Sequence, residues 1–145
     1  VFAGYWQAPE VTQAAFDGQG WLRTGDLARV DDEGYIYIVD RRKDMLVSGG
    51  FNIYPTEIEA VLAQHPAVYE VCVVGVPDEH WGEVVKAVVV LRAKHKDTSQ
   101  QAILDWCRDN MAVYKMPRAV QFVDALPKSG SGKVMWRTLQ EAEKV

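Results

Sequence analysis

The chain of 145 residues has the length of one ordinary domain and the composition of a globular protein. Hydrophobic residues make up 48% of it and charged residues 25%, with a formal net charge of −4. The acidic balance argues against a general nucleic-acid-binding protein. The sequence has no apolar run long enough to cross a bilayer, and because it shows no basic n-region or small-residue cleavage site we expect no signal peptide. We therefore expect a cytoplasmic protein with no nucleic-acid partner and no transmembrane segment.

A short helix and a β-hairpin are predicted at the N-terminal end. The helix covers 9–16 and begins at a proline, which suits a first helical turn. Strands are predicted over 22–30 and 35–39, with a turn between them that ends in Gly34. The charged run 40–44 separates two apolar stretches and is the expected domain boundary.

From residue 45 on, the pattern predicts the order β-α-β-β-α-β-α. The expected strands cover 45–48, 68–76, 84–91 and 119–123. The expected helices run from Pro55 to Pro66, from 98 to 110 and from 135 to 144. Two pairs have the spacing of capping boxes at helix starts, Thr56 with Glu59 and Thr98 with Gln101. The pattern indicates an α+β fold, in which helices cover a small sheet that we expect to have three strands.

Cysteine and histidine residues give no sign of a metal site. Cys72 lies in an apolar run and Cys107 in a helical pattern, so a reducing compartment is expected. The three histidines are scattered. We predict no metal-ligating residues.

The C-terminal end is basic, and it contains a flexible loop that presents a lysine. Residues 114–145 hold six Lys or Arg and three Asp or Glu, which suits either a small polyanion or a solvated helix face. The stretch 127–133 (PKSGSGK) ends at Lys133, whose ammonium could stabilise charge on a carboxylate and a phosphate. It is not a P-loop, because Pro127 and Val134 occupy positions that need glycine and serine or threonine. A plain flexible connector is the alternative.

Other polar or aromatic stretches allow a functional and a structural interpretation. Asp26 could bind ribose hydroxyls or be solvated next to a bulge. The cations 41–43 could contact phosphate near a hinge or form a polar linker. The turn 48–50 could admit a ligand to the main chain, and the cluster 114–118 could hold a nucleotide or simply contain snorkelling charges.

Three stretches together resemble the C-terminal part of the adenylate-forming acyl-CoA synthetases. They are 21–26 (WLRTGD), 40–59 (DRRKDMLVSGGFNIYPTEIE) and 127–133, and the likeness extends over 2–144. The closest similarity is to medium- and long-chain fatty acid–CoA ligases. The resemblance implies that 1–39 is the tail of a large N-terminal AMP-binding domain, 40–44 a hinge and 45–145 a mobile lid.

The resemblance also implies roles for particular residues. Lys133 would support adenylation, Asp26 and Arg41 would bind the nucleotide, and Lys43 would be the hinge residue. The implied CoA-binding residues are Gly49, Gly50, Trp81, Tyr114 and Arg118. The implied partners are a carboxylic (fatty) acid, ATP or AMP, CoA, Mg²⁺ bound mainly through ATP, and the chain's own N-terminal domain.

Two positions depart from the pattern of some relatives, and other functions remain open. Asn52 stands where an arginine can meet a phosphate, and Met116 where a basic residue can occur, so the CoA nucleotide contacts stay open. One alternative is a peptide-synthetase adenylation domain that loads a carrier-protein thiol. Another is a non-catalytic nucleotide- or protein-binding module. The start of the chain reads as the middle of a longer protein. Because the sequence encodes no acyl pocket and no ATP-phosphate loop, we expect this fragment alone to be inactive.

Overall fold

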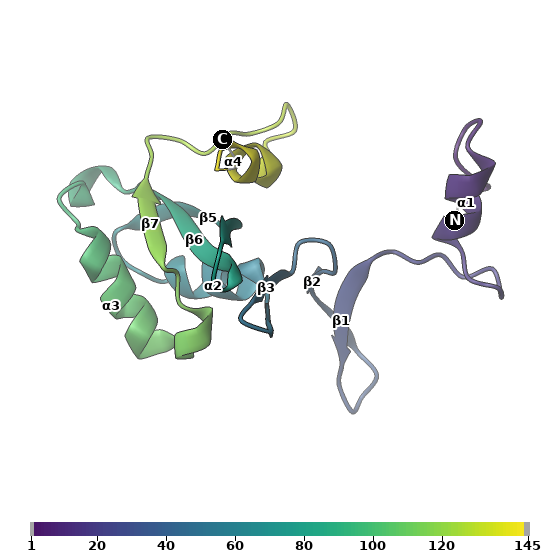
Figure 1. The fold of residues 1–145 in the computed structure, drawn as a ribbon, viewed down its shortest axis with the longest axis horizontal. Coiled ribbons are helices and arrows are strands. Elements are labelled where there is room, and N and C mark those ends of the chain that lie inside the picture. The colour runs from purple at the N-terminus through teal and green to yellow at the C-terminus, as the bar shows by residue number, and fades with distance from the viewer. Residues whose placement is uncertain (1, 144–145) are drawn as a thin grey trace. The chain divides into compact units, whose positions relative to one another are not determined.

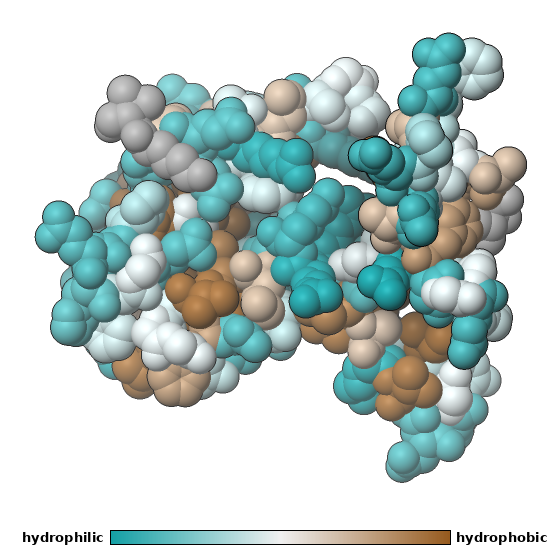
Figure 2. Space-filling model, turned by 45° about the vertical axis from the view of Figure 1, so that its right-hand side comes forward, coloured by the Kyte–Doolittle hydropathy of each residue, from teal (hydrophilic) through white to brown (hydrophobic). Residues whose placement is uncertain are grey.

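The computed structural model describes residues 2–143, which form two compact units that divide between Lys43 and Asp44 (Figure 1). Within that range, no helix combines the length and apolar character that a membrane span requires. Figure 2 shows hydrophobic residues as separate patches in a mostly hydrophilic surface.

The first unit contains one short helix and the predicted hairpin. Helix α1 (Pro9–Ala15) is followed by β1 (Asp26–Val30) and β2 (Ile36–Arg41), which pair antiparallel. The turn uses Gly34 at φ 87°, and the Asp31 carboxylate accepts a hydrogen bond from the Tyr35 backbone N–H. The hairpin prediction is confirmed, although β1 starts four residues later than expected and β2 continues to Arg41.

The second unit is built on one sheet of five strands. They are β3 (Leu46–Ser48), β4 (Phe51–Ile53), β5 (Val68–Asp78), β6 (Gly82–Leu91) and β7 (Ala119–Phe122). The order is β4-β3-β6-β5, and β7 pairs parallel to β6. The α+β class is confirmed, but the expected sheet of three strands is wrong. Strand β4 was not predicted because three residues after a glycine pair carry too little periodicity to indicate a strand.

Helices cover both faces of this sheet. Helices α2 (Pro55–Leu62) and α3 (Gln100–Asn110) cover one face, and α4 (Trp136–Ala142) covers the other (Figure 1). Alternate residues of the central strands enter two different core clusters. Val73, Val85, Ala87 and Val89 pack in the cluster that includes α2 and α3. Cys72, Val74, Val88 and Val90 pack in the cluster that includes Leu139 of α4.

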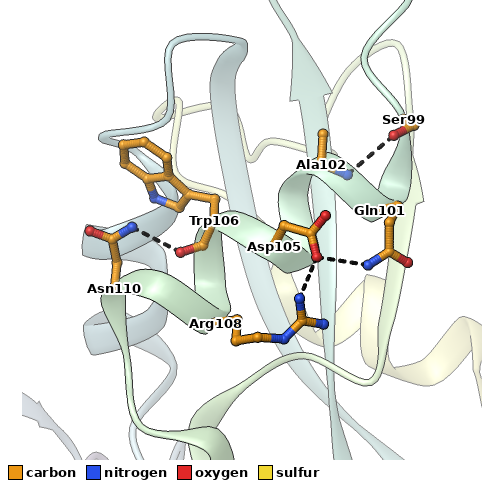
Figure 3. A network of polar contacts seen from close by, with 7 residues as sticks. All are labelled: Ser99, Gln101, Ala102, Asp105, Trp106, Arg108 and Asn110. Carbon is orange, nitrogen blue, oxygen red and sulfur yellow. Dashed lines mark hydrogen bonds and ion pairs between the residues drawn. The ribbon is translucent and has the colours of Figure 1, made fainter.

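Both predicted capping boxes are wrong. Helix α2 begins at Pro55, so Thr56 lies inside its first turn, and the Glu59 carboxylate instead accepts a hydrogen bond from the Val73 backbone N–H at 2.8 Å. At α3 the capping residue is Ser99 rather than Thr98, and its Oγ accepts from the Ala102 N–H at 3.1 Å (Figure 3). Capping requires an extended residue just before the helix, so a shift of one position changes which side chain can cap.

Candidate functional site

The turn between β3 and β4 is formed by two glycines with left-handed backbone angles. Gly49 has φ 56° and Gly50 φ 84°. Residues with a Cβ adopt these backbone angles only at a cost in conformational energy. The surroundings of the two differ sharply. A Cβ on Gly49 would lie 2.5 Å from Cε3 of Trp81, whereas a Cβ on Gly50 would meet no heavy atom within 4 Å. The turn is therefore backed by Trp81 at Gly49 and open at Gly50.

Trp81 is held in a short loop between β5 and β6. Its backbone N–H donates to Oδ1 of Asp78 at 2.8 Å, and its carbonyl accepts from the Gly49 N–H at 3.1 Å. The hydrogen bond from Trp81 is the main reason that the pKa of the Asp78 carboxyl lies below its usual value. The Arg118 guanidinium lies over the indole, 4.7 Å from the ring centroid. Trp81 thus joins the glycine turn to the segment just before β7.

A groove of about 580 Å³ opens beside this turn. Its lining residues are Ser48, Phe51, Trp81, Val85, Val113, Tyr114, Met116, Pro117 and Arg118. Phe51 and Tyr114 stack at a centroid distance of 4.9 Å, so they form an aromatic wall. Arg118 supplies a cation, and its backbone N–H is fixed on the Val85 carbonyl at 2.8 Å. Aromatic faces beside a guanidinium suit a flat ring system that carries phosphate.

The groove brings together three predicted residues that are far apart in sequence, Trp81, Tyr114 and Arg118. Gly49 and Gly50 lie next to it through the contact with Trp81. Met116, which departs from the basic residue of some relatives, also lines this groove. Phe51 belongs to the groove but was not among the predicted site residues. Its position directly after the glycine pair was the only sequence signal that could have indicated it.

Lys133 lies at the end of a tight loop. The Ser129 N–H donates to the Lys133 carbonyl, and the Gly132 N–H donates to the Ser129 carbonyl, each at 2.8 Å. Lys128, in the same loop, pairs with Glu70 of β5. Within residues 2–143 the Lys133 side chain has no ion pair and is exposed. The loop therefore has one anchored lysine and one lysine that is available to a ligand.

The lysine loop and the groove lie on opposite faces of the sheet. Val85, which lines the groove, packs in the cluster on the side of α2 and α3. Val134, the residue after Lys133, packs in the cluster on the side of α4. The structure thus separates Lys133 from the predicted CoA-binding residues. One rigid position of this unit could not bring both surfaces to the same small substrate.

Asp26, Arg41 and Lys43 belong to the first unit. The Arg41 Nε lies 3.4 Å from Oδ1 of Asp26, and the two residues are directly paired across β1 and β2. A pocket of about 530 Å³ is lined by Thr24, Gly25, Arg41, Arg42 and Lys43. Hydroxyl, backbone and cationic groups meet there, which suits a phosphorylated sugar. Among residues 2–143 no cluster of three or more His, Cys, Asp or Glu is placed to hold a metal ion.

The model of the AMP-binding enzyme C-terminal domain matches residues 57–133. The chain belongs to this family. It is 50% identical over 137 residues to the long-chain-fatty-acid–CoA ligase FadD13 of Mycobacterium tuberculosis. The matched region covers 94% of this chain and 27% of that protein. The resemblance to the adenylate-forming acyl-CoA synthetases is thereby confirmed.

Solved structures give the same result. ATP-bound MatB from Rhodopseudomonas palustris matches with a TM-score of 0.93 and 43% identity, covering 99% of this chain and 28% of that one. Apo MatB from the same organism matches with a TM-score of 0.72 and 42% identity over the same shares. The chain spans about a quarter of the length of these relatives.

Proposed function

We propose that this chain is the C-terminal part of an ATP-dependent acyl-CoA synthetase for a carboxylic acid of the fatty-acid type. The membership of the family and the identity to a long-chain-fatty-acid–CoA ligase support this proposal. We assign different steps of the reaction to Lys133 and to the glycine turn. This assignment rests on one observation, that the two lie on opposite faces of one sheet.

In the first half-reaction, an oxygen of the substrate carboxylate attacks the α-phosphorus of ATP. Pyrophosphate leaves and an acyl-AMP forms. The exposed ammonium of Lys133 stabilises the negative charge that develops on the carboxylate and the phosphate. Asp26 and Arg41 hold the ribose, and Mg²⁺ enters with the phosphates of ATP.

In the second half-reaction, the sulfur of CoA attacks the acyl carbon and AMP leaves. The unit that begins at Asp44 turns about Lys43, so that the turn at Gly49 and Gly50 replaces Lys133 at the adenylate. The pantetheine arm passes this turn, and Trp81, Tyr114 and Arg118 hold the nucleotide end of CoA.

The test is a chimera in which this chain replaces the matching C-terminal region of the Mycobacterium tuberculosis ligase. We expect the chimera to form acyl-CoA from a long-chain fatty acid, ATP and CoA, and the isolated 145-residue chain to form none. Acyl-CoA formation by the isolated chain would contradict the proposed division between the two domains. A folded chimera that makes acyl-AMP but loads only a carrier-protein thiol would contradict CoA as the acceptor.

A further inference from the structure

The side chain of Trp81 contacts the glycine turn with its edge and Arg118 with its face. A Cβ on Gly49 would lie 2.5 and 2.7 Å from Cε3 and Cζ3 of Trp81 but 3.8 Å from Cδ2, so the backbone approaches the rim of the ring. Real Cβ atoms do not come this close to another heavy atom. The indole therefore fills the space that any side chain at position 49 would need.

The indole is itself fixed from several directions. Asp78 accepts hydrogen bonds from the backbone N–H groups of His80 and Trp81 at 2.9 and 2.8 Å. The His80 ring meets the Trp81 ring edge to face at 4.9 Å. The Arg118 guanidinium covers the indole at 4.7 Å. Because the loop, the ring and the carbonyl of Trp81 are all held in place, Trp81 can fix the position of the Gly49 backbone that it contacts.

A second contact from the same loop reaches the strand before the turn. Gly82 pairs with Ser48 across β6 and β3, and the Val47 N–H donates a long hydrogen bond of 3.4 Å to Oε2 of Glu83. Strand β3 has only three residues, and Ser48–Gly82 is its one residue pair with β6. The segment 81–83 therefore supports the β3–β4 turn from the neighbouring strand of the sheet.

We infer that Trp81 is a positioning residue that sets the place of the glycine turn, so that its effect on thioester formation passes through the Gly49 backbone. The inference rests on the proposed function for its catalytic consequence, but the contact itself does not depend on that function. Trp81 is 37% exposed, so part of the ring also faces the groove. A direct contact with CoA and a positioning role therefore predict different kinetics, and the two can be separated.

The contact is tested first in the 145-residue chain by unfolding in urea. Gly49→Ala and Gly50→Ala carry a similar penalty for a left-handed backbone, but only the first meets Trp81. We expect Gly49→Ala to lower the folding equilibrium constant about tenfold more than Gly50→Ala does, as contacting residues couple on this scale. In a Trp81→Ala background this difference should vanish. Equal effects of the two alanines with Trp81 present would overturn the inference, whatever the chain's function.

The catalytic consequence is tested in the chimera with supplied acyl-AMP and CoA. A positioning role predicts that Trp81→Ala lowers kcat for thioester formation about tenfold or more, in addition to any rise in KM for CoA that follows from the loss of the ring from the groove. The adenylation half-reaction should not change. A raised KM with kcat intact would instead identify Trp81 as a CoA contact alone and overturn the positioning role. If the unaltered chimera makes no acyl-CoA, the proposed function fails, while the result with Gly49 and Gly50 still stands.

Discussion

The Nζ of Lys86 lies 2.7 Å from Oε1 of Glu143, and this ion pair joins the middle of β6 to the end of α4. The side chains are only 13% and 29% exposed, so water screens the pair weakly. The sheet face that carries Lys86 is the one on which the Lys133 loop packs. The pair therefore fastens the helix that follows the lysine loop to that face.

Glu143→Gln should destabilise the second unit, because it leaves the ammonium of Lys86 without its charged partner. We expect a loss of about 1–3 kcal/mol in the free energy of unfolding. Glu141→Gln is the matched control on the same helix, since Glu141 is exposed and makes no ion pair within residues 2–143. Urea titration of the two variants measures the difference. Equal stability of both would show that the pair does not anchor α4.

Lys133→Ala should impair adenylation in the chimera and spare the second half-reaction. Loss of one charge-stabilising donor lowers the rate by about 10²–10³-fold. Lys128→Ala is the matched control in the same loop, because Lys128 pairs with Glu70 rather than facing a ligand. Pyrophosphate release measures the first step, and thioester formation from supplied acyl-AMP measures the second. An equal loss in both steps, or an equal loss in both variants, would contradict the role of Lys133.

The sequence predicts those helices and strands that depend on interactions between neighbouring residues better than those that depend on contacts between distant residues. Strands β5 and β6 were predicted because long runs of β-branched residues need only local periodicity to be recognised. Strand β4 was missed, since its three residues are strands only through their pairing with β3. The capping residue of α3 was placed one position early, at Thr98 instead of Ser99, because spacing alone does not determine where the first helical turn starts.

The candidate site divides in the same way. Lys133, Asp26 and the glycine pair could be proposed because each lies in a short stretch with a distinctive order. Trp81 was proposed only through the resemblance to a family, whereas Tyr114 and Arg118 were also indicated by the aromatic and cationic residues of 114–118. The groove that joins the three depends on the fold. The contact between Gly49 and Trp81 spans 32 positions of sequence and is decided by a few tenths of an ångström. No local pattern contains such information.

The two cysteines should be unreactive until the second unit unfolds. Both are buried, and burial raises the pKa of Cys72 to about 12 and that of Cys107 to about 11. At pH 8 the thiolate, which is the reactive form, is therefore almost absent. We expect an aromatic disulfide reagent to label neither cysteine in buffer and both in urea. Rapid labelling of either one in buffer would contradict its burial.

Stability should fall as the pH drops below the ordinary pKa of histidine, because His65 is held in its neutral form. Burial lowers the pKa of His65, with a smaller contribution from His95, and its Nδ1 accepts a hydrogen bond from the Ala67 N–H at 3.1 Å. A lowered pKa in the folded state means that the unfolded chain binds the proton more readily. The contribution is therefore complete above about pH 6.5 and declines as the pH falls toward the lowered value. His65→Gln should remove this component of the pH dependence, measured as urea midpoints between pH 7.5 and 5; an unchanged slope would contradict it.

Lys43→Pro should separate the two half-reactions at the junction of the units. Proline fixes its own φ and also restricts the backbone of Arg42, the residue before it. The Arg42 N–H donates to the Gly25 carbonyl at 2.9 Å, so the chain is already held on the side of the first unit, and rotation must take place at or after Lys43. We expect the chimera with Lys43→Pro to release pyrophosphate at nearly the normal rate. It should form thioester from supplied acyl-AMP at least tenfold more slowly, which corresponds to a rise of about 1.4 kcal/mol in the activation free energy of the second step alone. Lys43→Ala, which removes the same ammonium group but keeps the backbone free, is the matched control against which both steps of the proline variant are compared. If the proline variant performed both steps at the rates of the alanine variant, the two surfaces of the second unit would not need to alternate by rotation about this residue.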